Sequence, residues 1–428
     1  MKRVYFIGFF VLLGVVYSSV KSSAQASIPD GTIPYGLGVQ LKGHNDDSGN
    51  LAHIAEAGFT WVRRGFIWES IEKEKGSYDF SRYDAFLNDC EANGLSVLAC
   101  MAFSNKLYGH VKDEPARSAY AAWAAAMADH YRGRNIVFEI WNEPNTMTFW
   151  GKHRPKGNSP EYAGEYTLLV KETTAAMKKA DKDCIILAGS VSNLWSESYN
   201  WITYCFRDGM MDLDWDIWSV HPYGLKAPED YIQAYSHVRH LMSEASGGRI
   251  EKRVWFNSER GFPLGKNEGY AGGDPALAEE YQAWHIIRQY LIDRLEGVPV
   301  TIWYEWSGKE GFSLWDGNKE SKALQAFRIL AREFNGYKIT RRIDNGNPRD
   351  FILLLEDSRG RRKIACWTAP PEMNTVDKTV PHSVTIRSDG LRGRVKVLDL
   401  YGDLSVCKTR RGALNLTVTG SPQYIILK

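Results

Sequence analysis

Two glutamates, Glu143 and Glu259, each stand at the end of an apolar run of the sequence. The first run leads into Trp141-Asn142-Glu143-Pro144. Because Pro144 has no amide hydrogen to give to a strand ladder, a strand is expected to end here. Apolar neighbours favour the neutral form of a carboxyl, which suits Glu143 to the role of a general acid. Glycoside hydrolysis needs two such groups, one that protonates the leaving oxygen and one that attacks or activates water.

The elements that position these glutamates follow a repeated pattern, in which a short apolar or β-branched run precedes a segment with helical spacing. The pattern occurs eight times within residues 27–335 and predicts a (β/α)8 TIM barrel. The strand-like runs are 36–43, 61–66, 96–102, 136–140, 184–190, 216–223, 253–259 and 300–306. A doubly wound open sheet is the competing fold. Its phosphate loop would need a third glycine after Gly36-Leu37-Gly38, but Leu41 stands there, so this signal fails.

The chain changes character at residue 336. Residues 336–428 contain short strand-like runs separated by turns such as Asp389-Gly390, which predict a small all-β sandwich domain. This domain could be a structural cap on the barrel or a separate sugar-binding module. Cys366 and Cys407 lie within it, and the sequence leaves open whether they pair or remain buried thiols.

Barrel enzymes hold their active sites at the C-terminal ends of the strands. Glu143 ends the fourth predicted strand and Glu259 the seventh, so they should face each other nearly across the barrel. Either glutamate alone could form an ion pair at the rim, but the two together, each beside aromatic residues, favour a hydrolytic site. Polar and aromatic residues at strand ends are candidates for substrate binding: Arg63, Trp68, Asn105, Asn142, His221, Tyr223 and Trp306.

These motifs resemble those of the retaining glycoside hydrolases of clan A. The resemblance rests on Trp141-Asn142-Glu143-Pro144, on His221-Pro222-Tyr223, on Ser258-Glu259 and on Arg63 with Trp68, and covers about residues 36–335. A Phe-Glu-Ile-Trp-Asn-Glu-Pro-Asn motif in a barrel followed by a β-sandwich is most similar to family 39 and neighbouring families.

The resemblance implies a role for each matching residue. Glu143 would be the general acid/base, and Glu259 the nucleophile that forms a covalent glycosyl-enzyme. Asn142 would donate to the sugar 2-hydroxyl, and Tyr223 would donate to Glu259. Arg63 would hold Glu259, or its neighbour Arg64 would do so if the strand register differs by one residue.

Two further residues, Trp306 and His221, complete the sugar site that the resemblance implies. Trp306 would form the floor of the subsite that holds the attacked sugar, although Trp303 on the same strand could take this place. His221 would line the same subsite. For Arg63, His221 and Trp306, the alternatives are core packing or an ion pair at the rim.

The composition of the chain indicates which classes of substrate to expect. The 428 residues carry a net charge of +2, which gives no reason to expect a nucleic-acid partner or an anionic membrane. Aromatic residues make up 13% of the chain, and aromatic faces stack well on sugars. We therefore expect a neutral β-linked glycan substrate, of the β-glucan, xylan or mannan type. Endo action is slightly favoured because Trp68, Trp150 and Trp195 could build several subsites.

Three alternatives remain at this point. One is an exo-acting β-glycosidase such as a β-xylosidase, and another is a glycan-binding barrel without catalysis. The third, a metal-dependent hydrolase, is disfavoured because the first strand does not end in His-x-His and the chain has no His-Glu-x-x-His. No metal or other cofactor is therefore expected.

The N-terminus has the features of an export signal. A basic Met1-Lys2-Arg3 precedes an apolar stretch from Val4 to Val16, and Ala24-Gln25-Ala26 offers a small-x-small cleavage site. Residues 1–26 are therefore predicted to be a signal peptide, and the mature protein to be periplasmic, on the cell surface or secreted, without a membrane span. A retained membrane anchor is the alternative.

Overall fold

The computed structural model describes residues 27–43, 45–151, 157–225, 227–249, 254–265, 271, 273–370 and 379–427. The predicted signal peptide, residues 1–26, lies outside this part of the chain. Among the described residues, none of the helices combines the length and apolar character that a membrane span requires.

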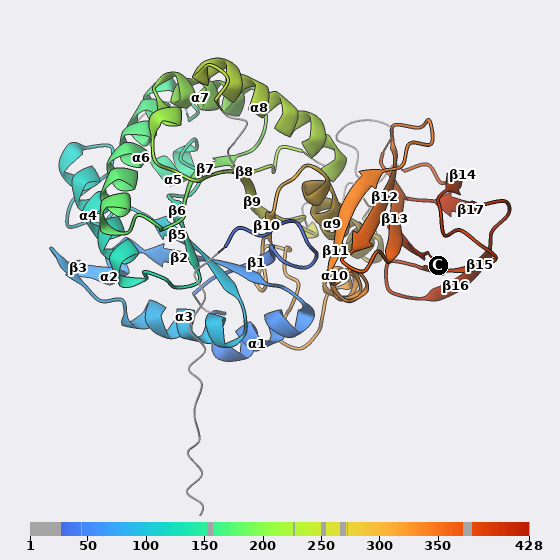
Figure 1. Cartoon of the computed structure of the whole chain (residues 1–428). Coiled ribbons are helices and arrows are strands. Elements are labelled where there is room, and N and C mark those ends of the chain that lie inside the picture. The colour runs from blue at the N-terminus through green and yellow to red at the C-terminus, as the bar shows by residue number, and fades with distance from the viewer. Residues whose placement is uncertain are drawn as a thin grey trace, which may run out of the picture.

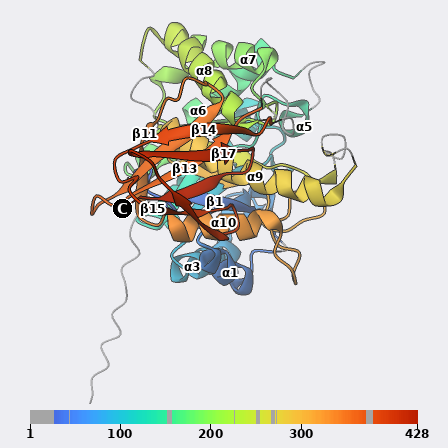
Figure 2. The same ribbon diagram turned by 90° about the vertical axis from the view of Figure 1, so that its right-hand side faces the viewer.

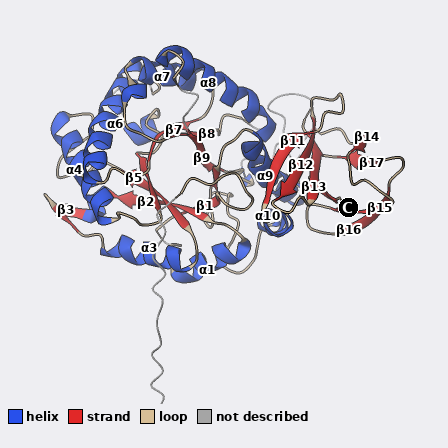
Figure 3. Cartoon of the chain, in the orientation of Figure 1, coloured by secondary structure: helices blue, strands red, loops and turns tan. Residues whose placement is uncertain are grey.

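Eight parallel strands close into a barrel surrounded by helices, as the sequence predicted (Figures 1 and 3). The strands are β1 (Leu37–Leu41), β2 (Trp61–Ile67), β5 (Ser96–Ala102), β6 (Ile136–Ile140), β7 (Ile186–Ser192), β8 (Ile217–His221), β9 (Val254–Arg260) and β10 (Val300–Trp303). Their order around the barrel is β1-β10-β9-β8-β7-β6-β5-β2. Two strands, β7 and β8, therefore lie between β6, which leads to Glu143, and β9, which carries Glu259.

The longer helices that cover the barrel are α1 (Ser48–Ala57), α3 (Ser81–Ala92), α4 (Glu114–His130), α6 (Pro160–Ala180), α7 (Ser196–Arg207), α8 (Tyr231–Ser246), α9 (Pro275–Leu295) and α10 (Lys322–Glu333). Local sequence sets their starts: Asp47 accepts from the amide of Asn50, and Ser159 accepts from the amide of Tyr162 just before Pro160. The short helices α2 (Trp68–Ile71) and α5 (Met147–Trp150) and the hairpin β3–β4 (Glu72–Glu74 and Ser77–Tyr78) follow barrel strands.

The barrel interior changes from apolar to polar along the strands. A cluster near the strand starts is formed by Trp61, Leu98, Val137, Leu187, Ile217, Phe256, Val300 and Ile302. Because side chains alternate along a strand, the inward position two residues later holds Arg63 on β2, Glu139 on β6 and Ser258 on β9. These polar residues thus form the layer directly beneath the C-terminal rim.

The C-terminal domain is a β-sandwich beside the barrel (Figures 1 and 2). One sheet has the order β11-β12-β13-β18-β15-β16, and β14 (His382–Arg387) pairs with β17 (Ala413–Val418) in the other. The six strands of the larger sheet are Tyr337–Arg342, Asp350–Asp357, Arg362–Thr368, Gln423–Ile426, Arg394–Leu398 and Leu404–Lys408, in that spatial order. The first and last of these, β11 and β16, were not among the strand-like runs recognised in the sequence.

Contacts between the barrel and the sandwich are specific. The Trp367 indole on β13 donates to Glu229, which also forms a buried ion pair with Arg288 on α9. Tyr401 donates to Glu280 on the same helix. All six cysteines are free, so Cys366 and Cys407 form no disulfide, and Cys366 packs in the sandwich core.

Candidate active site

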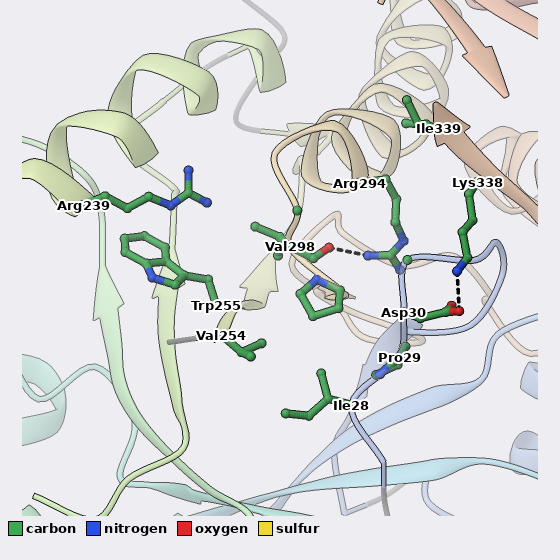
Figure 4. Close-up of a pocket in the computed structure, with 13 residues that line it drawn as sticks. Ile28, Pro29, Asp30, Arg239, Val254, Trp255, Arg294, Val298, Lys338 and Ile339 are labelled. Atoms are coloured by element: carbon green, nitrogen blue, oxygen red, sulfur yellow. Dashed lines mark hydrogen bonds and ion pairs between the residues drawn. The ribbon is translucent and has the colours of Figure 1, made fainter. Parts of the chain in front are cut away.

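A cavity of about 550 Å³ opens at the C-terminal ends of the barrel strands. Arg63, Asn142 and Glu259 line it together with Phe103 and Tyr304. Another cavity, of about 590 Å³, lies at the opposite end of the barrel, beside residues that precede β1 and β10 and begin β9 (Figure 4). The first cavity is the candidate active site. It is lined by the predicted Glu259 and lies at the C-terminal rim, where barrel enzymes hold their active sites.

Glu143 and Glu259 meet at this rim. One carboxylate oxygen of Glu143, one of Glu259 and one ring nitrogen of His221 all lie within 4.8 Å of one another. The Glu143 side chain is mostly buried, and Glu259 is slightly more exposed. The short separation fits the spacing of about 5–5.5 Å between the carboxyls of retaining glycosidases better than the 6.5–9.5 Å of inverting ones.

Arg63 is the centre of the polar layer beneath the rim. Its Nη1 donates to Glu259 Oε2 at 2.6 Å and to Gln40 at 3.0 Å, and its Nη2 donates to Asn142 Oδ1 at 2.6 Å. Its Nε donates to Glu139 Oε2. The expected contact between Arg63 and Glu259 is therefore present, while Arg64 pairs with Asp46 instead.

Both oxygens of Glu259 have a donor. Tyr223 donates its hydroxyl to Oε1 at 3.0 Å, and Arg63 serves Oε2. Burial, and after it the nearby charge of Glu259, raises the pKa of Tyr223 well above its usual value, so this hydroxyl stays protonated as a donor. Two fixed donors hold both oxygens of this carboxylate in place, which suits the residue to nucleophilic attack.

His221 is fully buried and joins the two halves of the site. Its Nδ1 lies 3.1 Å from Glu143 Oε1, and its Nε2 lies 2.9 Å from Ser258 Oγ. Burial alone would lower the pKa of His221, but the charge of Glu259, the Glu139 carboxylate 3.9 Å away and the hydrogen bond to Glu143 raise it to about 9. The imidazole is therefore protonated at neutral pH, and both nitrogens donate.

Glu139 is a site residue that the sequence analysis did not single out. Its fully buried carboxylate accepts from Arg63, from Ser190 Oγ at 2.6 Å and from Ser258 Oγ at 2.7 Å. Burial would raise its pKa, but the Arg63 charge and the nearby His221 ring lower the pKa of Glu139 to about 2. The available signal was the strand alternation, because Glu139 faces inward on the strand that leads to Glu143.

The backbone around Glu143 is held in an uncommon conformation. Trp141 and Glu143 have φ values of 68° and 45°, in the left-handed region that non-glycine residues rarely occupy. The side chain of Asn145 anchors the turn to β7, because Oδ1 accepts from the Ser192 amide and Nδ2 donates to the Ser192 carbonyl. Strain of this kind persists where surrounding contacts over-determine it, as is common at active sites.

Three predicted substrate-binding residues lie elsewhere. Trp306 is fully buried and donates to Asn50 on α1, because the chain turns outward after β10 ends at Trp303. Trp68 begins α2, where its indole donates to Glu72 and stacks on Tyr108. Asn105 supports the same region by donating to the Glu72 carbonyl. In the structure each of these three side chains packs the rim and does not line the cavity.

Tyr304 occupies the side of the cavity where a tryptophan was expected. Trp303, the alternative, is also fully buried and donates its indole hydrogen to the Phe312 carbonyl. Lys42 lies over the Tyr304 ring, 5.0 Å from its centroid, and forms a 2.7 Å ion pair with the buried Glu305. Tyr304 is therefore the aromatic residue of this last strand segment that lines the cavity.

A metal site is a poor fit to these residues. Glu143, His221 and Glu259 are close enough together to be considered as ligands. However, a metal needs a neutral imidazole nitrogen, whereas both His221 nitrogens already face hydrogen-bond partners and the pKa of the ring is about 9. The donor set suits proton transfer and nucleophilic attack better than metal binding.

Comparison with known proteins identifies related chains. A family model described as cellulase (glycosyl hydrolase family 5) matches residues 37–307. A β-xylosidase from Caldicellulosiruptor saccharolyticus is 24% identical over 251 residues, which cover 53% of this chain and 47% of the relative. The match thus spans about half the length of that curated relative.

Solved structures share the fold. A family 39 glycoside hydrolase from Bacteroides cellulosilyticus WH2 has a TM-score of 0.74 at 20% identity, covering 94% of this chain and 82% of that chain. A GH30 endoxylanase from Clostridium papyrosolvens C71 has a TM-score of 0.62 at 13% identity, covering 95% of this chain and 99% of that one. Both coverages extend over the barrel and the C-terminal sandwich.

Proposed function

Since this chain belongs to the cellulase family, glycosyl hydrolase family 5, we propose that it is a retaining β-glycosidase that works by double displacement. The membership confirms the predicted clan of glycoside hydrolases, and the fold similarity extends to family 39. The observation that carries the proposal is the pair of Glu143 and Glu259, whose oxygens lie within 4.8 Å of each other and have different partners.

In the first step, Glu259 attacks the anomeric carbon while Glu143 protonates the leaving oxygen. His221 Nδ1 lies 3.1 Å from Glu143 Oε1 and fixes the position of the carboxyl that protonates the leaving oxygen. Arg63 and Tyr223 hold Glu259 in place for attack. The attack forms the covalent bond to the sugar and breaks the bond to the leaving oxygen.

In the second step, Glu143 takes a proton from water, and this water releases the sugar from Glu259. Asn142 supports both steps. Because its Oδ1 accepts from Arg63, its amide nitrogen is oriented as a donor at the cavity wall, where the sugar 2-hydroxyl would lie. A contact of this kind strengthens in the transition state.

The proposed substrate is a β-linked plant or microbial wall glycan, with a xylan-type chain preferred over β-glucan or mannan. Support comes from the names of the related proteins, a β-xylosidase and an endoxylanase. We still slightly favour endo action. Trp195 now provides the support for an additional subsite, because Trp68 and Trp150 are fully buried. Exo action as a β-xylosidase is the alternative, and oligosaccharide product patterns over time separate the two.

Covalent trapping tests the mechanism. A 2-fluoro-β-xyloside with an activated leaving group should inactivate the enzyme, and mass spectrometry of a digest should place the added sugar on Glu259. The Glu259→Gln variant should show neither turnover nor labelling, whereas Glu310→Gln, at an exposed rim carboxyl, should retain both. Hydrolysis that survives in Glu259→Gln would remove this residue from the mechanism and assign the attack to another nucleophile. The absence of both turnover and labelling in the parent would favour the glycan-binding alternative.

We also propose that the protein is exported by its N-terminal segment and acts in the periplasm, at the cell surface or in the medium. The support is the basic, apolar and small-x-small order of residues 1–26. N-terminal sequencing of the protein from a cell that secretes it should give Ser27 as the first residue. Recovery of Met1 in the membrane fraction would favour a retained anchor.

A further inference from the structure

A groove of about 570 Å³ on the C-terminal domain is lined almost entirely by cations and hydrogen-bonding side chains. Its residues are Thr385 and Arg387 on β14, Ala413 and Asn415 on β17, and Lys408, Arg410 and Arg411 at the end of β16 and the turn after it. The strands β14 and β17 lie on the side of the sandwich that faces away from the barrel (Figures 1 and 2). The groove is therefore separate from the catalytic cavity.

The cations of this groove lack carboxylate partners. In the described part of the chain, Arg387, Lys408, Arg410 and Arg411 form no ion pair, whereas Arg361 of the same domain pairs with Asp357. Residues 387–411 contain seven Lys or Arg and three Asp residues, a net charge of +4 against +2 for the whole chain. Four of these seven cations, Arg387, Lys408, Arg410 and Arg411, line the groove.

Two features of the groove lower the stability of the folded domain. Lys408 lies directly opposite Arg394 in the β15–β16 pair, and like charges in such a pair repel each other. Arg411 and Gly412 are the central residues of a two-residue turn closed by hydrogen bonds between Arg410 and Ala413, and both have positive φ. This kind of turn favours asparagine or glycine where Arg411 stands. A bound anion would offset the repulsion.

We propose that this groove binds the carboxylates of an acidic polysaccharide, a chain that contains uronic acid residues. Arginine side chains bind carboxylates with paired hydrogen bonds. Thr385 donates to Asn415 Oδ1 at 2.9 Å, which leaves the Asn415 amide group as a donor for sugar hydroxyls. The inference rests on the proposed glycosidase function, because the groove would hold the enzyme on a wall matrix that contains its neutral substrate.

Other polyanions fit the groove less well. Single-stranded nucleic acids stack their bases on aromatic side chains, and the groove lining contains none. A bilayer offers a flat surface to a concave site, although Leu404 and Val406 are exposed on β16 beside it. Both polyanions are therefore included as competing outcomes of the test.

The test measures binding by affinity electrophoresis and calorimetry with polygalacturonate as the probe. The full chain carries Glu259→Gln, so that the result does not depend on hydrolysis. The charge variant is Arg387→Gln with Arg410→Gln and Arg411→Asn, in which asparagine suits the turn. The matched control removes three exposed lysines of the barrel, Lys73, Lys179 and Lys182, by substitution with glutamine.

We expect polygalacturonate to bind the parent and the barrel control equally, and the charge variant at least tenfold more weakly. The affinity of the parent should fall as salt is added, and neutral xylan should not retard the protein through this groove. Thermal unfolding should show the charge variant at least as stable as the parent, which separates lost binding from lost folding.

Three results would overturn the proposal: no binding of polygalacturonate, equal binding by the charge variant, or equally groove-dependent binding of DNA or anionic phosphatidylglycerol vesicles. The proposed function is judged separately, by covalent labelling of Glu259 with a small aryl glycoside. Failure of either experiment therefore leaves the other intact.

Discussion

Arg63 Nη1 donates to Glu259 Oε2 at 2.6 Å from a guanidinium that is itself 2% exposed. The same guanidinium also holds Glu139, Asn142 and Gln40, so its planar fork fixes four side chains at once. Lysine is a point charge on a flexible stem and cannot reproduce this geometry. The position of Glu259 thus depends on the shape of its cationic partner as well as on its charge.

The Arg63→Lys variant should therefore lose about 100-fold or more in kcat/KM on an aryl β-glycoside, because a misplaced nucleophile is costly. Steady-state kinetics on protein of verified fold measures this loss. The neighbouring Arg64→Lys variant is the control, since Arg64 pairs with Asp46 and does not contact Glu259. Equal losses in the two variants would contradict the assigned register.

Glu139 acts as a positioning residue, because it touches Arg63 and the serines beneath the rim without reaching the cavity. The Glu139→Gln variant removes one partner of a buried ion pair, which costs about 3 kcal/mol of folding free energy. We also expect kcat to fall, because Arg63 is no longer held from below. Denaturant unfolding and kinetics together measure the two effects.

A second buried glutamate supplies the control for Glu139. Glu229 is paired with Arg288 and accepts from Trp367, away from the catalytic cavity. The Glu229→Gln variant should lose comparable stability and keep the parent kcat. If Glu139→Gln also kept the parent kcat, its role would be only structural.

His221 should make stability depend on pH. The pKa of His221 is raised to about 9 from an ordinary value of 6.5, so the protonated ring binds its proton more tightly in the folded state. Its contribution to stability is fully present below pH 6.5 and is lost as the pH rises through 9. The free energy of unfolding should therefore decline over this window.

Unfolding by denaturant at several pH values should show this decline in the parent and a shallower one in His221→Gln. His382 also has a raised pKa, through its hydrogen bonds to the Val380 carbonyl and to Asp350, so both proteins should carry His382→Gln. Parallel curves would mean that His221 is not protonated in the folded protein.

The role of Glu143 can be read from the leaving group. The Glu143→Gln variant should lose about 10²–10⁴-fold in kcat/KM on a substrate whose leaving group needs protonation. The loss should be much smaller for a dinitrophenyl glycoside, whose leaving group departs as an anion. Steady-state kinetics of the parent and the variant on the two substrates measure these losses. Equal losses would indicate that Glu143 binds the substrate and does not transfer a proton.

The sequence predicted the barrel and the two glutamates because both follow from local order. Apolar runs mark strands, and Pro144 marks the end of the run before Glu143. The resemblance proposed that Arg63 holds Glu259, with Arg64 as the alternative, and in the structure Arg63 makes this contact. The sequence does not show which residues of different strands contact one another. Glu139 was therefore not recognised as a site residue, although Arg63 and Ser258 both donate to it in the structure.

Three residues that were expected at the substrate pack the rim instead, and their placement has a common cause. Trp306 and Asn105 come after regular strands have ended, so the alternation of side chains no longer says where they point. Trp68 follows β2 directly but begins a helical turn, which rotates its indole into the layer of Tyr108 and Trp123. Tyr304, at the corresponding point after β10, reaches the cavity instead.

Trp195 is the remaining exposed tryptophan of the three that the sequence suggested for distant subsites. It follows β7 at the C-terminal rim, packs near Gly224 and is 48% exposed. A sugar that stacks on this indole would gain about 0.5–1.5 kcal/mol. The Trp195→Ala variant should therefore lose about three- to tenfold in kcat/KM on xylohexaose and nothing on a short aryl xyloside. Tyr35→Ala is the control, since Tyr35 is 54% exposed just before β1, at the opposite end of the barrel. Unchanged kinetics on xylohexaose in Trp195→Ala would remove the support for an extended cleft and favour exo action.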